Sequence, residues 1–119
     1  MLDRADRLHR QFFQLGREAH RGASWEPPVD IYETAGELAV MVALPGVEPG
    51  HISVRIEGDT LLVSGSRTLP SFADPIRIHR LEIPQGRFER QIRLQSGRLE
   101  LTHRENRDGC LLLIFHKLP

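Results

Sequence analysis

The hydrophobic pattern changes its period close to residue 29, and this change constrains the fold more than any other feature of the chain. Before it, residues 2–21 carry apolar side chains every three or four positions, which predicts an amphipathic helix with one apolar stripe. The stripe consists of Ala5, Leu8, Phe12, Leu15 and Ala19, and it is widened by Leu2 and Phe13. After residue 29, apolar and polar residues alternate, as they do in strands that bury one face. We therefore expect one helix followed by an all-β domain.

Two regions follow from this pattern. Residues 1–28 are expected to form the helix and a linker, because Pro27 and Pro28 exclude a helix at the end of this region. Residues 29–119 are expected to form the β domain, with alternation in residues 38–44, 52–57, 88–94 and 111–115 and shorter apolar pairs at Leu61/Val63 and Leu99/Leu101. About seven short strands, separated by turn-forming Pro, Gly and Asp residues every eight to twelve positions or so, predict an immunoglobulin-like antiparallel β-sandwich.

Composition and charge exclude several classes of protein. The 16 basic and 16 acidic residues balance, which argues against a nucleic-acid or membrane-surface binder and leaves little repulsion between copies of the chain. A single cysteine, Cys110, excludes an intrachain disulfide. Charged residues interrupt the N-terminus, and the longest apolar run, residues 110–115, is too short to span a bilayer. A cytoplasmic location is therefore expected.

No group of residues has the pattern of a catalytic or cofactor site. The six histidines are scattered, without the spacing of metal ligands. Cys110 lies among aliphatic residues and is expected to be a buried, inert thiol. Ser64 lacks the flanking glycines of a nucleophile elbow. We expect no enzyme activity, no metal and no cofactor.

Six segments, in their order and spacing, resemble the α-crystallin domain of the small heat-shock proteins. They are Trp25-Glu26-Pro27-Pro28-Val29-Asp30-Ile31, Leu44-Pro45-Gly46-Val47, Leu61-Leu62-Val63-Ser64-Gly65-Ser66-Arg67, His79-Arg80-Leu81-Glu82, Gly86-Arg87-Phe88-Glu89-Arg90, and Asp108-Gly109-Cys110-Leu111 with Lys117. The resemblance covers roughly residues 25–117. It implies an ATP-independent holdase that binds partly unfolded proteins and prevents their aggregation. It also implies a homodimer in which the loop around residues 68–79 crosses to the partner's sheet.

The chain departs from the family pattern at three places. Gln95 follows Leu94 where the family has proline, residues 101–107 are unusually charged, and no isoleucine-x-isoleucine motif follows Lys117. The missing motif disfavours a large cage and favours an alternative, a tail-less subunit or regulator that co-assembles with a full-length small heat-shock protein. A second alternative is an adaptor or co-chaperone that binds one folded partner, but the long loop of residues 67–80 argues against it.

That loop contains a segment similar to the missing motif, Pro75-Ile76-Arg77-Ile78. We interpret it as part of a short strand at residues 76–79 rather than as a displaced motif. The resemblance places the dimer interface on the loop and on the strand that follows it, at Phe72, Asp74, Ile76, Ile78 and Arg90.

Arg90 shares a strand face with Phe88 and Ile92, which is expected to be the core face. A charged side chain there must be paired or lie at an edge or an interface. One interpretation is an arginine that reaches the edge of the sandwich. The other, which the family resemblance implies and which we favour, is an arginine that bridges the dimer, with Asp74 of the other chain as its candidate partner.

The last predicted strand carries apolar residues on both faces. Leu111, Leu113 and Phe115 share the core face, whereas Leu112 and Ile114 share the other. Apolar residues on both faces indicate that both are covered, and the candidate cover is the N-terminal helix of the same chain or a neighbour. This helix is either a packed element or a reversible cover that itself binds clients. The expected client-binding or helix-docking surface is Leu8, Phe12, Phe13, Leu15, Leu112 and Ile114.

Overall fold

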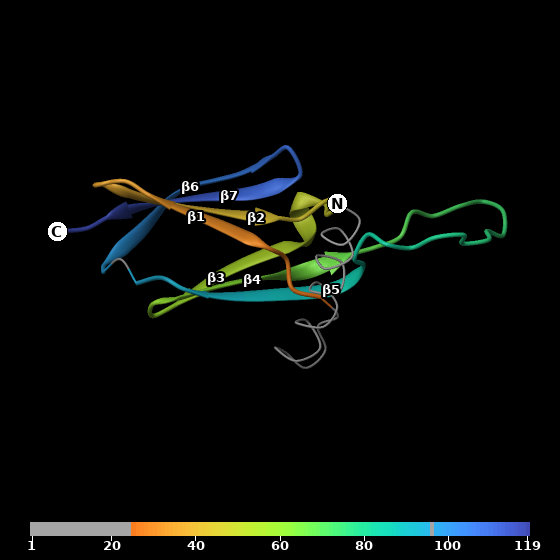
Figure 1. Ribbon diagram of the computed structural model, residues 1–119, viewed down its shortest axis with the longest axis horizontal. Coiled ribbons are helices and arrows are strands. Elements are labelled where there is room, and N and C mark those ends of the chain that lie inside the picture. The colour runs from red at the N-terminus through yellow and green to blue at the C-terminus, as the bar shows by residue number, and fades with distance from the viewer. Residues whose placement is uncertain (1–24, 96) are drawn as a thin grey trace, which may run out of the picture.

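The computed structural model describes residues 25–95 and 97–119, whose strands form two antiparallel sheets packed face to face (Figure 1). The strands are β1 (Val29–Glu33), β2 (Glu37–Ala43), β3 (Ile52–Glu57), β4 (Thr60–Arg67), β5 (Gly86–Arg93), β6 (Leu99–Arg107) and β7 (Cys110–Lys117), with a short 3-10 turn, η1, at Pro49–His51. One sheet has the order β1-β2-β7-β6 and the other β3-β4-β5. The predicted β-sandwich is confirmed, whereas the predicted helix at residues 2–21 lies outside the described residues.

The core lies between the sheets because the strands bury alternate residues. In β2, Leu38, Val40 and Val42 are buried while Ala39 and Met41 are partly exposed. The other strands add the rest of the core: Leu44, Ile52, Leu61, Val63, Phe88, Ile92, Leu94, Leu111, Leu113 and Phe115. Each large apolar side chain that is fully buried stabilises the fold by about 1.5–3 kcal/mol relative to an exposed one, so this layer is the main driving force for folding.

The packed core already includes residues of the approach segment, our name for residues 25–28 ahead of β1. Trp25 and Pro27 are fully buried. The indole Nε1 of Trp25 donates a hydrogen bond to the carbonyl of Gly86 (3.2 Å), and its ring lies 5.1 Å from that of Phe88. Trp25 also forms a bridge with Phe88. The approach segment is therefore held against the start of β5 before the chain enters β1.

The edge strand β6 is longer than its apolar residues predict. The sequence marks only Leu99 and Leu101, but the strand continues through the charged residues 102–107 to the Asp108–Gly109 turn. These residues are held by pairing with β7, after a register shift between Leu101 and His103. Charged side chains are common on edge strands, because they discourage pairing with another molecule. Strand pairing, rather than alternation, determines where β6 ends.

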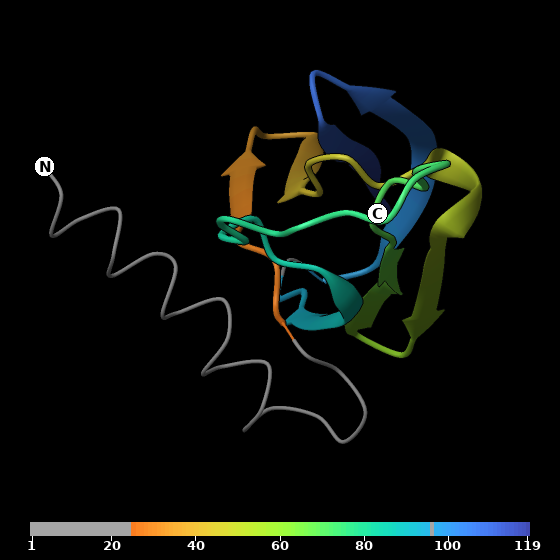
Figure 2. The same ribbon diagram turned by 90° about the vertical axis from the view of Figure 1, so that its right-hand side faces the viewer.

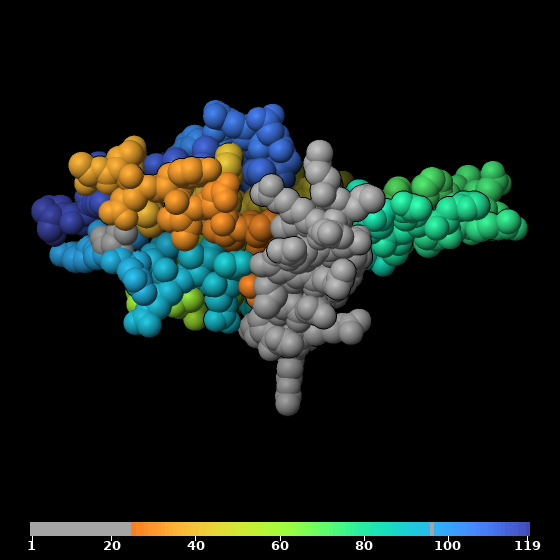
Figure 3. Space-filling model, in the orientation of Figure 1, coloured from red at the N-terminus to blue at the C-terminus, as the bar shows by residue number. Residues whose placement is uncertain are grey.

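Residues 68–85, between β4 and β5, form an arm that projects beyond the end of the sandwich (Figures 1 and 3). The short strand expected at residues 76–79 is absent, so that expectation is wrong for the single chain. The physical reason is that the arm has no neighbouring strand with which to pair. Figure 2 looks along the arm onto the end of the sandwich and shows both sheets behind it. Among residues 25–95 and 97–119, no helix has the length and apolar character that a membrane crossing requires.

Candidate functional site

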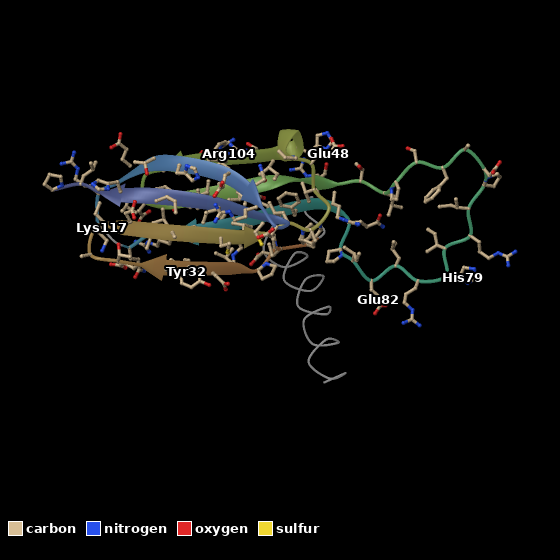
Figure 4. The ribbon with its side chains drawn as sticks, turned by 90° about the horizontal axis from the view of Figure 1, so that it is seen from above. Tyr32, Glu48, His79, Glu82, Arg104 and Lys117 are labelled. Carbon is tan, nitrogen blue, oxygen red and sulfur yellow. The ribbon has the colours of Figure 1, made fainter. Side chains whose placement is uncertain are left out.

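The arm carries the largest group of exposed apolar side chains in the described part of the chain. Phe72 is 59% exposed, Ile76 51% and Ile78 53%. With three neighbours they form the arm cluster, which consists of Leu69, Phe72, Ile76, Ile78, Leu81 and Ile83. Residues from both limbs line one hollow. In Figure 4, His79 and Glu82 project from the arm far from the sandwich. An apolar cluster this exposed is typical of a surface that another protein covers.

Arg67 anchors the base of the arm. It ends β4, and its Nη1 donates a hydrogen bond to the carbonyl of Pro84 (3.4 Å), just before β5 begins. The Pro45–Gly46 turn covers the guanidinium so closely that a Cβ on Gly46 would lie 2.9 Å from its Nε. This Nε is buried and has no hydrogen-bond partner within the described chain. Arg67 thus joins the two ends of the arm and fixes where it leaves the sandwich.

The second exposed feature is β1, the edge strand of the four-stranded sheet. Within residues 25–95 and 97–119 it pairs only with β2, on one of its two sides. Ile31 lies opposite Val40 and therefore faces inward, yet it is 48% exposed. Tyr32 faces outward, and its hydroxyl donates a hydrogen bond to Asp30 (3.2 Å). The charge of Asp30, followed by this hydrogen bond, raises the pKa of Tyr32. β1 therefore presents a free edge with an uncovered apolar side chain.

Sequence reasoning missed Ile31 and Tyr32 as candidate interface residues. They were assigned to the beginning of the β domain without a role. The available signal was their position, because an isoleucine and a tyrosine on a strand at a sheet edge mark an edge suited to pairing.

Arg90 lies on the predicted face of β5, between the buried Phe88 and Ile92. Its Nη1 lies 3.3 Å from Glu26 Oε1 and donates a hydrogen bond to the carbonyl of Pro27, also at 3.3 Å. The Arg90 side chain is 32% exposed and that of Glu26 is 16% exposed. In the single chain, Arg90 therefore reaches the edge of the sandwich and holds the approach segment. Its expected contact with Asp74 of another chain stays a prediction.

Four of the five expected interface residues lie together on the arm, namely Phe72, Asp74, Ile76 and Ile78. Arg90 lies instead in β5, within the sandwich. Of the expected client-binding or helix-docking residues, Leu112 and Ile114 lie on the outer face of β7 and are partly exposed. Leu8, Phe12, Phe13 and Leu15 lie outside the described residues.

The thiol of Cys110 is more accessible than the sequence analysis expected. It is partly exposed, because it falls on the outer face of β7 together with Leu112 and Ile114. The expectation of a buried thiol is therefore wrong. Within the described part of the chain, no group of three or more His, Cys, Asp or Glu residues is arranged to hold a metal ion.

Residues 30–118 match the model of a family described as the Hsp20/alpha crystallin family. The chain belongs to this family. A 19.0 kDa class II heat shock protein from Oryza sativa subsp. japonica is 32% identical over 129 residues, covering 99% of this chain and 74% of that protein. A 17.8 kDa class II heat shock protein from Zea mays is 33% identical over 94 residues, covering 77% of this chain and 57% of that protein. The chain thus spans little more than half of the maize relative.

Solved structures agree with the fold. The crystal structure of hspA from Xanthomonas axonopodis superposes with a TM-score of 0.68 at 30% sequence identity, covering 80% of this chain and 96% of that chain. The α-crystallin-type sandwich is thereby confirmed. The family to which the chain belongs consists of chaperones.

Proposed function

We propose that this protein is an ATP-independent holdase that binds partly unfolded proteins and prevents their aggregation. The observation that carries the proposal is the outer face of β7, where Leu112 and Ile114 are apolar, partly exposed and used by neither the core nor the arm. Partly unfolded clients expose apolar surface, and its burial against a second apolar surface is favourable without a nucleotide or a chemical step. Membership of a chaperone family supports this function.

The minimum unit is a homodimer in which the arm of each copy lies along β1 of the other. The arm brings Phe72, Ile76 and Ile78, and β1 offers a free edge and the uncovered Ile31. An extended segment that adds to a sheet edge satisfies backbone hydrogen bonds and buries alternate side chains at once. Such pairing also closes an edge that would otherwise promote aggregation. Asp74 enters the same interface from the arm.

Arg90 supports this dimer from within its own chain. Its contacts with Glu26 and Pro27 hold the approach segment, and two residues later the chain enters β1. A secured approach segment keeps the β1 edge in position for the partner's arm. An additional contact between Arg90 and Asp74 of the second copy is part of the proposal.

A pair of neighbouring substitutions tests the dimer. Ile78 and His79 are both exposed in the single chain, so an aspartate at either position adds one negative charge without disturbing the core. Ile78→Asp removes an apolar contact worth about 1.5–3 kcal/mol if fully buried, and because the symmetric dimer contains this contact twice, the dimer dissociation constant should rise roughly 150- to 25,000-fold. His79→Asp is the matched control and should change it much less. Equal effects, measured by analytical ultracentrifugation, would contradict the assignment of the arm.

The holdase activity is tested by heating an unrelated client with equal amounts of this protein, without nucleotide, while light scattering follows aggregation. Suppression by a dimer or small oligomer supports the proposal. A monomer without suppression refutes it and favours the adaptor. Weak activity alone, combined with incorporation into a full-length small heat-shock protein on mixing, favours the co-assembling subunit. We also propose a cytoplasmic location, which the single cysteine supports because secreted domains of this size are usually disulfide-rich.

A further inference from the structure

Two oppositely charged side chains lie on the two elements that the proposed dimer brings together. Asp30 belongs to β1 and Arg77 to the arm, and both are exposed. In the described part of the chain neither forms an ion pair, whereas Arg80, three residues further along the arm, is paired with Glu82 (3.4 Å). The Asp30 carboxylate accepts a hydrogen bond from Tyr32 (3.2 Å), which brings no positive charge. Asp30 and Arg77 are therefore available to a second molecule.

The outward face of β1 is where Asp30 lies. The pairing register with β2 turns Ile31 inward and turns Asp30 and Tyr32 outward, and Figure 4 shows Tyr32 on the outermost strand of this sheet. Their neighbours in β2, Met41 and Ala39, are uncharged, so β2 supplies no counter-charge. The charge of Asp30 raises the pKa of Tyr32, as expected of a carboxylate without a cation beside it.

The proposed pairing of the arm with β1 determines where Arg77 lies. In an extended segment, successive side chains alternate between two faces. In the proposed dimer, Ile76 and Ile78 lie inward beside Ile31, so Arg77, between them, lies outward. The reverse assignment would leave both isoleucines in water and bring the guanidinium to the apolar side, which is costly for an unpaired charge. Burial of the isoleucines therefore brings Arg77 to the same face as Asp30.

This placement does not depend on the direction or the exact register of the paired strands. Ile31 can lie opposite either isoleucine of the arm, in a parallel or an antiparallel arrangement. In all four cases Arg77 lies opposite Asp30 or opposite Tyr32, whose hydroxyl is bonded to Asp30. Residues directly opposite each other have Cβ atoms roughly 5 Å apart, and diagonal neighbours lie about 7–8 Å apart. An arginine side chain covers either distance, so each arrangement allows an ion pair with Asp30.

We propose that Arg77 of each copy pairs with Asp30 of the other copy, and that this pair determines which arm β1 accepts. The inference rests on the proposed dimer and adds a requirement to it: the arm that pairs with β1 carries a basic residue between its two inward apolar side chains. An arm with an acidic residue there is rejected, because like charges on neighbouring strands repel. A symmetric dimer contains the contact twice, which doubles its effect on the choice of partner.

Charge reversal on separate full-length chains tests this pair. Arg77→Asp brings two carboxylates together at both contacts of its homodimer, and Asp30→Arg brings two guanidinium groups together. Each variant alone should therefore dimerise at least several-fold more weakly than the natural chain. Mixed in equal amounts, the two variants should form a heterodimer of nearly natural affinity, because both of its contacts then join opposite charges. Analytical ultracentrifugation with one chain fluorescently labelled measures the three affinities, and their differences should shrink as salt is added.

Arg80→Asp is the matched control. It makes the same change of charge on the arm, at a position that already has a partner in its own chain, so mixing it with Asp30→Arg should not restore the heterodimer. Natural affinity of either single variant would overturn the pair, as would the absence of mutual rescue or a rescue no greater than that of the control. Those results leave the proposed dimer intact, because that dimer is tested separately by Ile78→Asp against His79→Asp.

Discussion

Replacement of Arg90 by alanine tests which contact this arginine makes. Arg90→Ala removes the ion pair with Glu26 and the hydrogen bond to Pro27, and it leaves the Glu26 carboxylate, only 16% exposed, without its partner. A fully exposed pair is worth about 0.2–1 kcal/mol, whereas breaking a fully buried one costs about 3–5 kcal/mol. With side chains 32% and 16% exposed, this pair lies between the two limits. We expect the free energy of unfolding to fall by about 1–3 kcal/mol.

The assay is urea denaturation followed by fluorescence of Trp25, which packs on Phe88 beside this contact. A double-mutant cycle with Glu26→Gln should give a coupling energy of about 1 kcal/mol, because residues in direct contact are not additive. Asp74→Asn is the control, and its effect on the free energy of unfolding of the monomer should simply add to the effect of Arg90→Ala. Additivity between the Glu26 and Arg90 substitutions would refute the intrachain ion pair.

The same variant tests the dimer. Because the approach segment leads into β1, its release should also weaken dimerisation, as measured by analytical ultracentrifugation. An unchanged dimer dissociation constant for Arg90→Ala would refute a role for this residue in the interface. Coupling between Arg90→Ala and Asp74→Asn in dimer affinity, without coupling in monomer stability, would identify the contact between chains.

Three further comparisons probe the sandwich. Leu113→Ala, in the core, should lower the free energy of unfolding by about 2–5 kcal/mol. Leu112→Ala, one residue away on the outer face, should lower it by roughly 1 kcal/mol or less. Equal losses of stability in urea denaturation would contradict the assignment of the two faces. Gly65→Ala places a Cβ 2.1 Å from a backbone carbonyl oxygen and should destabilise by at least about 1–3 kcal/mol, while Gly36→Ala, in open space, should not. The hydrogen bond from Arg93, more than its charge, lowers the pKa of Asp59 below its ordinary value of 3.8. This contact therefore stabilises the fold at pH values above 3.8, and the stabilisation is lost as the pH falls through the pKa that Asp59 has in the folded state. Urea midpoints of the natural chain and Asp59→Asn should therefore converge in acid, and a constant difference across pH would contradict the linkage.

Alternation alone was enough to predict the sandwich and much of its core. It placed Leu111 and Leu113 on the buried face of β7 and Leu112 on the other, as the structure shows. This works because a strand has a period of two, so that one correctly assigned residue fixes the face of all its neighbours. The same rule, applied to Cys110, places it on the outer face, and the expectation of a buried thiol failed because it relied on the aliphatic neighbours instead.

Side-chain partners were harder to predict than faces. The face of Arg90 follows from its position between Phe88 and Ile92, but its partner does not. Glu26 belongs to a segment that the prolines mark as a linker, and nothing in local periodicity shows that this segment packs against β5. The ion pair depends on how two distant parts of the chain are brought together, which is a property of the tertiary structure.

The arm shows a different limit, since its conformation is not a property of one chain. The alternation of Ile76 and Ile78 favours a strand locally, and yet the single chain forms none there. A strand needs a neighbour to satisfy its backbone hydrogen bonds, and an isolated extended segment in water is not stable without one. β1 is a strand with an unpaired edge, because among the described residues it pairs with β2 on one side only. In the proposed dimer, the strand expected at residues 76–79 would gain the neighbouring strand that it lacks in the single chain, and this lack is why the sequence pattern and the structure disagree at this place.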